Sequence, residues 1–137
     1  MSVLLRALIT LLCGVGLYAS LFMLFKLRRA ERGELTEPSV VQNPRAKLYG
    51  GVPNSVFGVA YYAALAVVCW LPLPAWAAAG VLLAVALAAG TSFYLAYTLL
   101  FVTRATCPYC WTAHAVNCSL LVAVPWLFKI IILSNGQ

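Results

Sequence analysis

The chain has 137 residues, of which 64% are hydrophobic and only 9% are charged. Soluble domains carry roughly 25% charged residues, so this composition excludes an ordinary soluble fold and indicates that lipid is the solvent. The formal net charge of +6 comes from nine Lys and Arg against three Asp and Glu. These basic residues flank apolar runs, which is typical of charge at membrane boundaries and argues against nucleic acid as a partner.

The first apolar run predicts a transmembrane helix over about 3–27. It is uncharged from Ala7 to Phe25, between Arg6 and Lys26. The tripeptide YAS resembles a signal-peptide cleavage site, but the apolar run continues past it and is longer than the roughly 7–15-residue core of a signal peptide. We therefore expect this helix to be retained.

Three further helices follow a polar segment. No Asp, Glu, Lys or Arg occurs from Leu48 to Thr103, and one crossing needs about 20 apolar residues, so this run crosses at least twice. It divides at WLPLPAW, where the prolines disfavour helix and the tryptophans suit a membrane interface. The predicted helices span about 52–71, 75–103 and 107–132.

The polar segment, over about 28–51, is basic and rich in turn residues. With an even number of crossings, both termini lie on one side and this loop shares the other side with the start of the last helix. Seven of the nine Lys and Arg lie on the loop side, which favours a cytoplasmic loop by the positive-inside rule. Since backbone amides in hydrocarbon need internal partners, the sequence predicts an all-α, four-helix transmembrane bundle, one domain over 1–137.

The last predicted helix opens with the motif CPYC, from Cys107 to Cys110. Two cysteines at this spacing can close a small disulfide ring, and the exposed amides and dipole of a helix start favour a thiolate. Pro108 suits the first turn, where its missing N–H would have no partner. The pattern predicts a redox pair in which one sulfur is the nucleophile and the other resolves a mixed disulfide. The alternative is two small apolar residues that happen to be cysteines.

His114, the only histidine, lies four residues after Cys110 on the same predicted helix face. A histidine at membrane depth needs a partner, cavity or ligand, so it could donate a hydrogen bond or move a proton beside the thiols; packing against another helix is the alternative. Cys118 continues this face but lies about 16 Å from Cys107 on a straight helix, too far to share one zinc ion at about 2.3 Å per bond. We therefore expect no metal site. The cysteines interpreted as packing residues are Cys13, Cys69 and Cys118.

The second predicted helix begins with Asn54 after Pro53. Asn is a favoured N-cap, so this side chain could cap the helix, or it could donate its amide to a ligand. Phe57, Tyr61 and Tyr62 follow within about two turns and offer aromatic surface, for which ordinary bundle packing is the alternative reading.

Three motifs together resemble the vitamin K epoxide reductase family: PNSVFG, SFYLAYTLLFV and TCPYCWTAHAVNCSL. The resemblance runs without a gap from about Phe93 to Leu120 and resumes around Asn54 to Tyr62, so with the helix count it covers most of the chain. Microbial members of the family are thiol–quinone oxidoreductases that generate protein disulfides. The resemblance implies a bundle around a quinone of the ubiquinone, menaquinone or vitamin K type, and a thioredoxin-like or other dithiol protein as partner.

The resemblance also implies roles for single residues. Cys107 and Cys110 match the catalytic pair, with Cys110 facing the quinone and Cys107 exchanging with the incoming dithiol. Asn54 matches an asparagine that hydrogen-bonds one quinone oxygen, and His114 stands where some members carry a tyrosine that contacts the other. The remaining quinone-lining positions are Phe57, Tyr61, Tyr62 and Leu95.

One departure from the family concerns the loop between the first two helices. Members usually carry a second cysteine pair there that relays electrons, whereas Leu27 to Tyr49 contains no cysteine. An intramolecular relay is therefore impossible, and a partner dithiol or a shuttle polypeptide must reach Cys107. The missing pair also leaves open a non-catalytic accessory subunit of a membrane complex or, less in keeping with the sequence, a thiol carrier of soft metal ions.

The expected location is a multi-pass position in a prokaryotic cell membrane. The charge count places the active end in the cytoplasm, as in some archaeal members of the family, whereas many microbial relatives act outside it. The sequence leaves both orientations open.

Overall fold

The computed structural model of the chain describes residues 2–34, 51–104 and 107–135. Its elements are α1 (Ser2–Glu31), α2 (Asn54–Val68), α3 (Ala75–Tyr97), the π-helix η4 (Thr98–Thr103) and α4 (Pro108–Asn135). The all-α class predicted from the sequence is confirmed for these described ranges. Most of the expected polar loop, residues 35–50, lies outside them.

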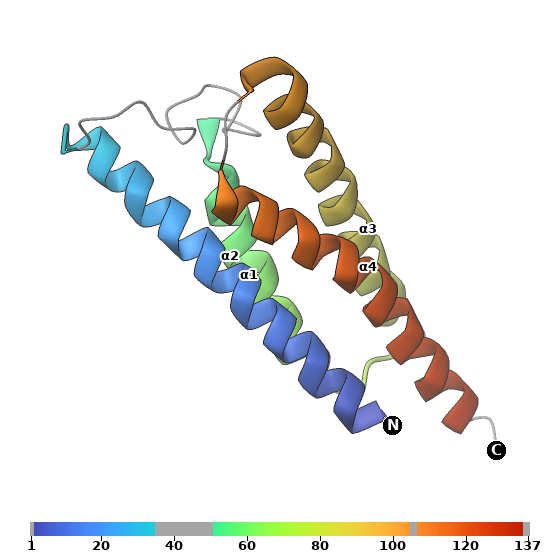
Figure 1. The fold of residues 1–137 in the computed structure, drawn as a ribbon. Helices are drawn as coiled ribbons and strands as arrows, with labels where there is room; N and C mark the ends of the chain where they lie inside the picture. Colours follow the sequence, from blue (N-terminus) through green and yellow to red (C-terminus); the bar gives the residue numbers. More distant parts are fainter. Residues whose placement is uncertain (1, 35–50, 105–106, 136–137) are drawn as a thin grey trace.

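The four α-helices form an up-and-down bundle (Figure 1). α1 packs against both α2 and α4, and α3 packs against α4. α2 and α4 run in one direction while α1 and α3 run in the other, and the two chain ends lie at the same end of the bundle. The start of α4 therefore lies at the opposite end from the termini, together with the polar end of α1.

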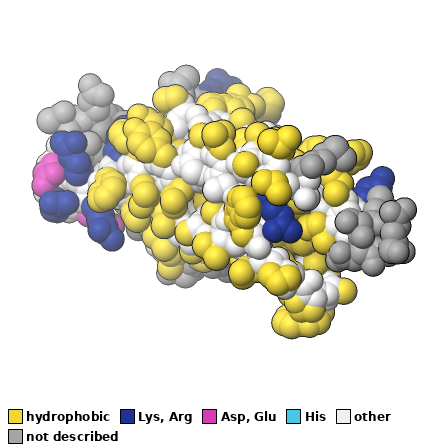
Figure 2. Space-filling model, turned by 90° about the horizontal axis from the view of Figure 1, so that it is seen from below, with side chains coloured by type: hydrophobic (Ala, Val, Ile, Leu, Met, Phe, Trp, Pro, Cys, Tyr) yellow, Lys and Arg dark blue, Asp and Glu magenta, His cyan; other side chains and the backbone are white. Residues whose placement is uncertain are grey.

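Three helical stretches are long and apolar enough to cross a membrane: Ser2–Glu31, Ala75–Val102 and Pro108–Ile131. Many large apolar side chains point outward from them, and Figure 2 shows hydrophobic side chains spread over most of the face that it presents. Because so much exposed apolar surface requires lipid, the chain is a multi-pass integral membrane protein.

α2 is shorter than the predicted 52–71. It has 15 residues, about 22 Å of helix, which is less than the hydrocarbon core of about 30 Å. Pro53 takes the cap position with extended backbone (ψ 139°), and Asn54 is already the first helical residue. Of the two interpretations of Asn54 that the sequence left open, capping of this helix is therefore wrong. At the other end, single turns at Trp70 and Leu71 lead the chain into the following prolines.

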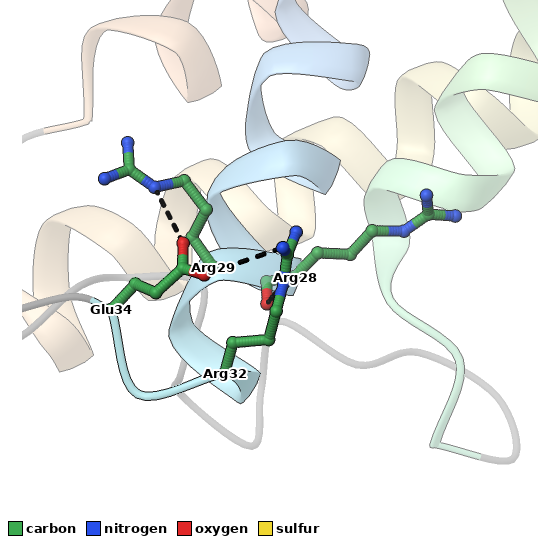
Figure 3. Close-up of polar contacts among 4 residues, drawn as sticks. All are labelled: Arg28, Arg29, Arg32 and Glu34. Atoms are coloured by element: carbon green, nitrogen blue, oxygen red, sulfur yellow. Dashed lines mark hydrogen bonds and ion pairs between the residues drawn. The ribbon is translucent and has the colours of Figure 1, made fainter.

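α1 continues to Glu31, beyond the predicted end at 27, and stops at a glycine. Gly33 adopts a left-handed φ of 73°, and the N–H groups of Gly33 and Glu34 return to carbonyls of the last turn at 3.0 Å each. The Glu34 carboxylate then meets Arg29 at 3.4 Å and Arg32 at 3.5 Å (Figure 3). These ion pairs are exposed and contribute little, so the glycine motif is what ends the helix.

The last part of the third predicted helix is wound differently from expectation. The α-helix ends at Tyr97, and η4 continues it in wider turns to Thr103. Thr98 donates from its hydroxyl to the Leu95 carbonyl at 2.8 Å. Arg104 follows with a left-handed φ of 48°, so the chain changes direction sharply before α4.

α1 and α2 approach closely at two glycines. A Cβ placed on Gly16 would lie 2.5 Å from the Tyr62 ring, and one on Gly58 would lie 2.5 Å from the Ser20 hydroxyl oxygen. Neither site has room for a side chain. The largest fully buried side chains, which form the centre of the core, are Tyr62, Ile9, Leu120, Leu127, Val85, Val124 and Cys13.

Candidate active site

A disulfide joins Cys107 and Cys110 at the start of α4, with their Cα atoms 5.2 Å apart. Pro108 is the first helical residue, as predicted. The Cys107 carbonyl accepts from the Trp111 N–H at 3.1 Å, and the Cys107 sulfur accepts from the Cys110 N–H at 3.2 Å. A helix start and a donated N–H both stabilise negative charge on that sulfur when the bond is reduced.

The two sulfurs differ in their surroundings. Cys107 is 6% exposed, whereas Cys110 is half-buried. The Cys107 Sγ lies 3.9 Å from the Met23 Sδ. Between the cysteines, the Tyr109 ring stacks on Phe22 with centroids 3.9 Å apart. α1 therefore covers one side of the disulfide, a contact that no sequence pattern indicated.

His114 lies one turn further along α4. It is half-buried, and its Nδ1 atom is buried without a hydrogen-bond partner in the described part of the structure. The Trp111 ring meets the imidazole edge to face, with centroids 6.0 Å apart. Four residues separate His114 from Cys110, about 6 Å along the axis. An imidazole with an unpartnered buried nitrogen thus lies about one helical turn along α4 from Cys110.

A buried polar network joins α2, α3 and α4. The Tyr62 hydroxyl donates to Asn117 Oδ1 at 2.9 Å, with the Ala113 carbonyl also in reach at 3.3 Å. Asn117 in turn donates from Nδ2 to Ser92 Oγ at 2.6 Å. Tyr62, predicted to line a quinone site, is only 2% exposed, and its hydroxyl is engaged in this network. Sequence reasoning missed Asn117, although it lies three residues after His114 on the same helix face.

This network fixes the depth of α2 relative to α4. The two helices run in the same direction (Figure 1) and meet where Tyr62 binds Asn117. Asn54 lies eight residues before Tyr62, about 12 Å toward the loop end. Cys110 lies seven residues before Asn117, about 10 Å in the same direction. The predicted quinone donor and the disulfide are therefore at similar depth.

The same argument applies to α3, which runs opposite to α4 (Figure 1). Ser92 meets Asn117 at 2.6 Å. Leu95, half-buried, lies three residues after Ser92, and His114 lies three residues before Asn117, so both are about 4.5 Å nearer the disulfide end. The structure thus places these two predicted residues in one layer of the bundle.

The remaining predicted site residues lie on α2. Phe57 is 46% exposed, so its ring is not in the core. Tyr61 is half-buried, its ring lies 5.1 Å from that of Tyr62, and its hydroxyl is buried without a partner among the described residues. Tyr61 and His114 are therefore the two predicted site residues whose buried polar atoms still lack a hydrogen bond.

The cysteines outside the pair are free. Cys13 and Cys69 are buried and Cys118 is half-buried. Cys13 and Cys69 pack in the main hydrophobic cluster. Within the described ranges no three His, Cys, Asp or Glu side chains come close enough together to hold a metal ion.

A helical membrane bundle whose last helix opens with a closed cysteine pair is the arrangement expected of a membrane thiol–disulfide oxidoreductase. A family model described as the Vitamin K epoxide reductase family matches residues 7–124. The chain belongs to this family. A comparison with curated proteins found no match. Family members generally catalyse quinone-dependent thiol oxidoreduction in the lipid bilayer, together with thiol-redox partner proteins.

Proposed function

We propose that this chain passes electrons from a partner dithiol through the Cys107–Cys110 disulfide to a bound quinone, and so supports protein disulfide formation. The observation that carries the proposal is the closed cysteine pair at the start of α4, one turn from the unpartnered Nδ1 of His114. An electron-accepting ligand at this place would meet the cysteine pair, which is a reductant once a partner dithiol has reduced it, and a hydrogen-bonding group.

The exchange step begins when a partner thiolate attacks the Cys107 sulfur. The bond to Cys110 breaks, and Cys110 leaves as a thiolate at membrane depth. A second partner thiolate then attacks the mixed disulfide, releasing the partner as a disulfide and Cys107 as a thiolate held by the Cys110 N–H at 3.2 Å. The partner loses two electrons and two protons, and the cysteine pair gains them.

The residues proposed to hold the quinone fit its chemistry. The Nδ1 of His114 and the hydroxyl of Tyr61 are buried polar atoms without partners in the described structure, and burial strengthens their hydrogen bonds to a carbonyl oxygen. His114 donates when its proton is on Nδ1. A quinone held by these residues would supply the oxidant, with capacity for the two electrons and two protons of the reduced cysteine pair. The proposed lining, in addition to His114, is Asn54, Phe57, Tyr61, Tyr62 and Leu95.

The source of electrons follows from the missing loop cysteines. Leu27 to Tyr49 contains no cysteine, so no second pair of this chain can relay electrons to Cys107. A thioredoxin-like or other dithiol protein must therefore approach the loop end of the bundle itself. The quinone type and the identity of the partner protein can both be determined with the preparation described next.

The test is dithiol-driven quinone reduction by the full chain in lipid nanodiscs. We expect Cys110→Ala to abolish it, and the same variant to trap the partner as a mixed disulfide on Cys107, visible by mass spectrometry. Cys118→Ala, which removes a free, half-buried cysteine of the same helix, should keep the parental rate. A Cys110→Ala rate within twofold of the parent would refute the proposal.

The absence of loop cysteines also favours a second candidate, an accessory subunit that keeps the fold without turnover. Such a subunit would co-purify with a membrane protein in fixed stoichiometry. It would show no thiol-dependent quinone reduction even when its cysteine pair is intact.

A further inference from the structure

We propose that Phe22 and Met23 of α1, with Tyr109 of α4, form a clasp that shields the Cys107 sulfur and must open before an incoming thiol can reach it. We call these three residues the α1 clasp. The inference rests on the proposed function for the identity of the incoming thiol, but the shielding itself is a property of the described residues.

Two contacts build the clasp. The Phe22 and Tyr109 rings stack with centroids 3.9 Å apart and an interplanar angle of 18°. The neighbouring Met23 places its Sδ 3.9 Å from the Cys107 Sγ. Tyr18, one turn earlier on α1, meets the same Tyr109 ring at 6.5 Å. Since Tyr109 stands inside the CPYC motif, the stack holds the disulfide loop against α1.

The consequence is a difference in access between the two sulfurs. Cys107 is 6% exposed while Cys110 is half-buried, although family resemblance assigns the exchange with the partner to Cys107. Thiol–disulfide exchange depends on access to the sulfur that is attacked. With the clasp closed, the Met23 thioether lies against the Cys107 sulfur, so the Met23 side chain must move before a thiolate can attack.

The clasp is built to open without disturbing the core. Phe22 is 36% exposed, so the stack lies at the edge of the bundle and not among the fully buried side chains. Met23 is unbranched and has three rotatable bonds, so a rotamer change clears it. The loss of one aromatic pair corresponds to roughly a twofold to tenfold rise in the ratio of open to closed clasp. A partner that offers an apolar surface to Tyr109 could supply that much, which would make opening selective for the docked partner.

The test is the alkylation rate of each cysteine in the full chain, reduced with a phosphine in lipid nanodiscs and treated with N-ethylmaleimide. Peptide mass spectrometry separates the sites. We expect Phe22→Ala to speed alkylation of Cys107 about fivefold, within the range for one aromatic pair, and to change that of Cys110 by less than twofold. Phe22→Tyr keeps a ring for the stack and should retain the parental rate. Phe25→Ala removes a ring of the same helix that is 60% exposed, and should also leave Cys107 unchanged.

Cys13 reports folding in the same spectra because it is only 1% exposed. If Phe22→Ala makes Cys13 reactive too, that variant is misfolded. Tyr109→Leu, the variant that removes the other ring of the stack, then tests the clasp in its place. The clasp is overturned if neither variant selectively exposes Cys107, or if Phe25→Ala exposes it equally. Quinone reduction measured on the parent separates the two proposals: its absence with a selective Phe22→Ala effect removes the proposed function alone, and its presence without that effect removes the clasp alone.

Discussion

His114 shows what a single polar side chain can do at membrane depth. The Trp111 ring meets its imidazole edge to face, and its Nδ1 is buried with no partner in the described structure. A polar atom left unpaired in an apolar environment is costly, so this nitrogen is available to a ligand that could bind there. The sequence left packing and function open for this residue, and the substitution below distinguishes them.

We predict that His114→Phe raises the KM for quinone up to about tenfold, the loss of one hydrogen bond. The Cys107–Cys110 disulfide should still form, because Phe preserves an aromatic ring against Trp111. Steady-state kinetics with a fixed dithiol and varied quinone measure the effect. His114→Asn, which restores a donor, should recover part of the loss. Unchanged quinone kinetics in the Phe variant would remove His114 from the site.

Asn117 supports the structure rather than the chemistry. Its side chain links the Tyr62 hydroxyl to Ser92 across three helices at 2.9 and 2.6 Å. We predict that Asn117→Ala lowers the free energy of unfolding by about 1–3 kcal/mol, since it leaves buried polar groups without partners. Thermal unfolding in detergent measures the change. Ser119→Ala removes only an exposed hydroxyl bonded within its own helix, and should shift stability by less than about 0.5 kcal/mol.

Equal stability losses in Asn117→Ala and Ser119→Ala would mean that the network contributes nothing to stability.

For single residues, the sequence was sufficient where the chemistry is local. Pro108 in the first turn of α4 follows from its missing N–H, and the disulfide from the spacing of two cysteines. Asn117 and Met23 act through residues of other helices, and a pattern within one helix does not contain those contacts.

The short α2 has a consequence at the scale of the elements. Trp70 follows it at the terminal end of the bundle, where Arg6 donates to the Trp70 carbonyl at 3.2 Å. From Asn54 to Val68 the helix is about 22 Å long, which falls short of the roughly 30 Å hydrocarbon core. With Trp70 at one membrane interface, as is typical of tryptophan, we expect Asn54 to begin its helix inside the boundary on the loop side. This depth suits the proposed contact with a quinone oxygen.

Helix existence was predictable from composition, but helix ends were not. Proline and tryptophan in WLPLPAW predict the break between α2 and α3. The helix nevertheless ends earlier, at Val68, and single turns at Trp70 and Leu71 lie between it and the prolines. The change from α3 to η4 at Thr98 has no signal in hydropathy, since both parts are apolar. Gly33 ends α1 through a left-handed φ, a signal that local reasoning could have used.

The contact between α1 and α2 depends on glycine, which gives a matched pair of substitutions. We predict that Gly16→Ala destabilises the bundle by about 1–3 kcal/mol, the usual range for overpacking, because the new methyl group would lie 2.5 Å from the buried Tyr62 ring. Gly14→Ala has no atom within 4 Å of its Cβ, and should be neutral or stabilising by up to about 1 kcal/mol. Unfolding in detergent compares them. Similar effects of both variants would contradict the packing of α1 on Tyr62.

For the whole molecule, aromatic and basic residues mark one membrane boundary. At the terminal end, Arg6 lies 6.0 Å from the centroid of the Trp70 ring and Lys129 lies 5.3 Å from that of Trp126. Tryptophan and long basic side chains favour the interface between hydrocarbon and water. Arg6 and Lys26 are twenty residues apart on α1, about 30 Å of helix, which equals the hydrocarbon thickness. These boundary residues are thus sufficient to predict the depth of the bundle in the bilayer, independently of the proposed site.

The distribution of charge favours one of the two membrane orientations. Both termini lie at one end (Figure 1), and of the seven Lys and Arg in the described ranges, five lie toward the opposite, loop end: Lys26, Arg28, Arg29, Arg32 and Arg104. We therefore predict that the disulfide end is cytoplasmic and that a reporter fused after Gln137 lies outside, because positive residues are retained on the cytoplasmic side. Paired fusions, one active only outside the cytoplasm and one only within it, measure this directly. Replacing Arg28, Arg29 and Arg32 by glutamine should produce a mixed population, whereas Lys129→Gln should not. A reporter active only in the cytoplasm would reverse the assignment and direct the search for the dithiol partner to the outer side of the membrane.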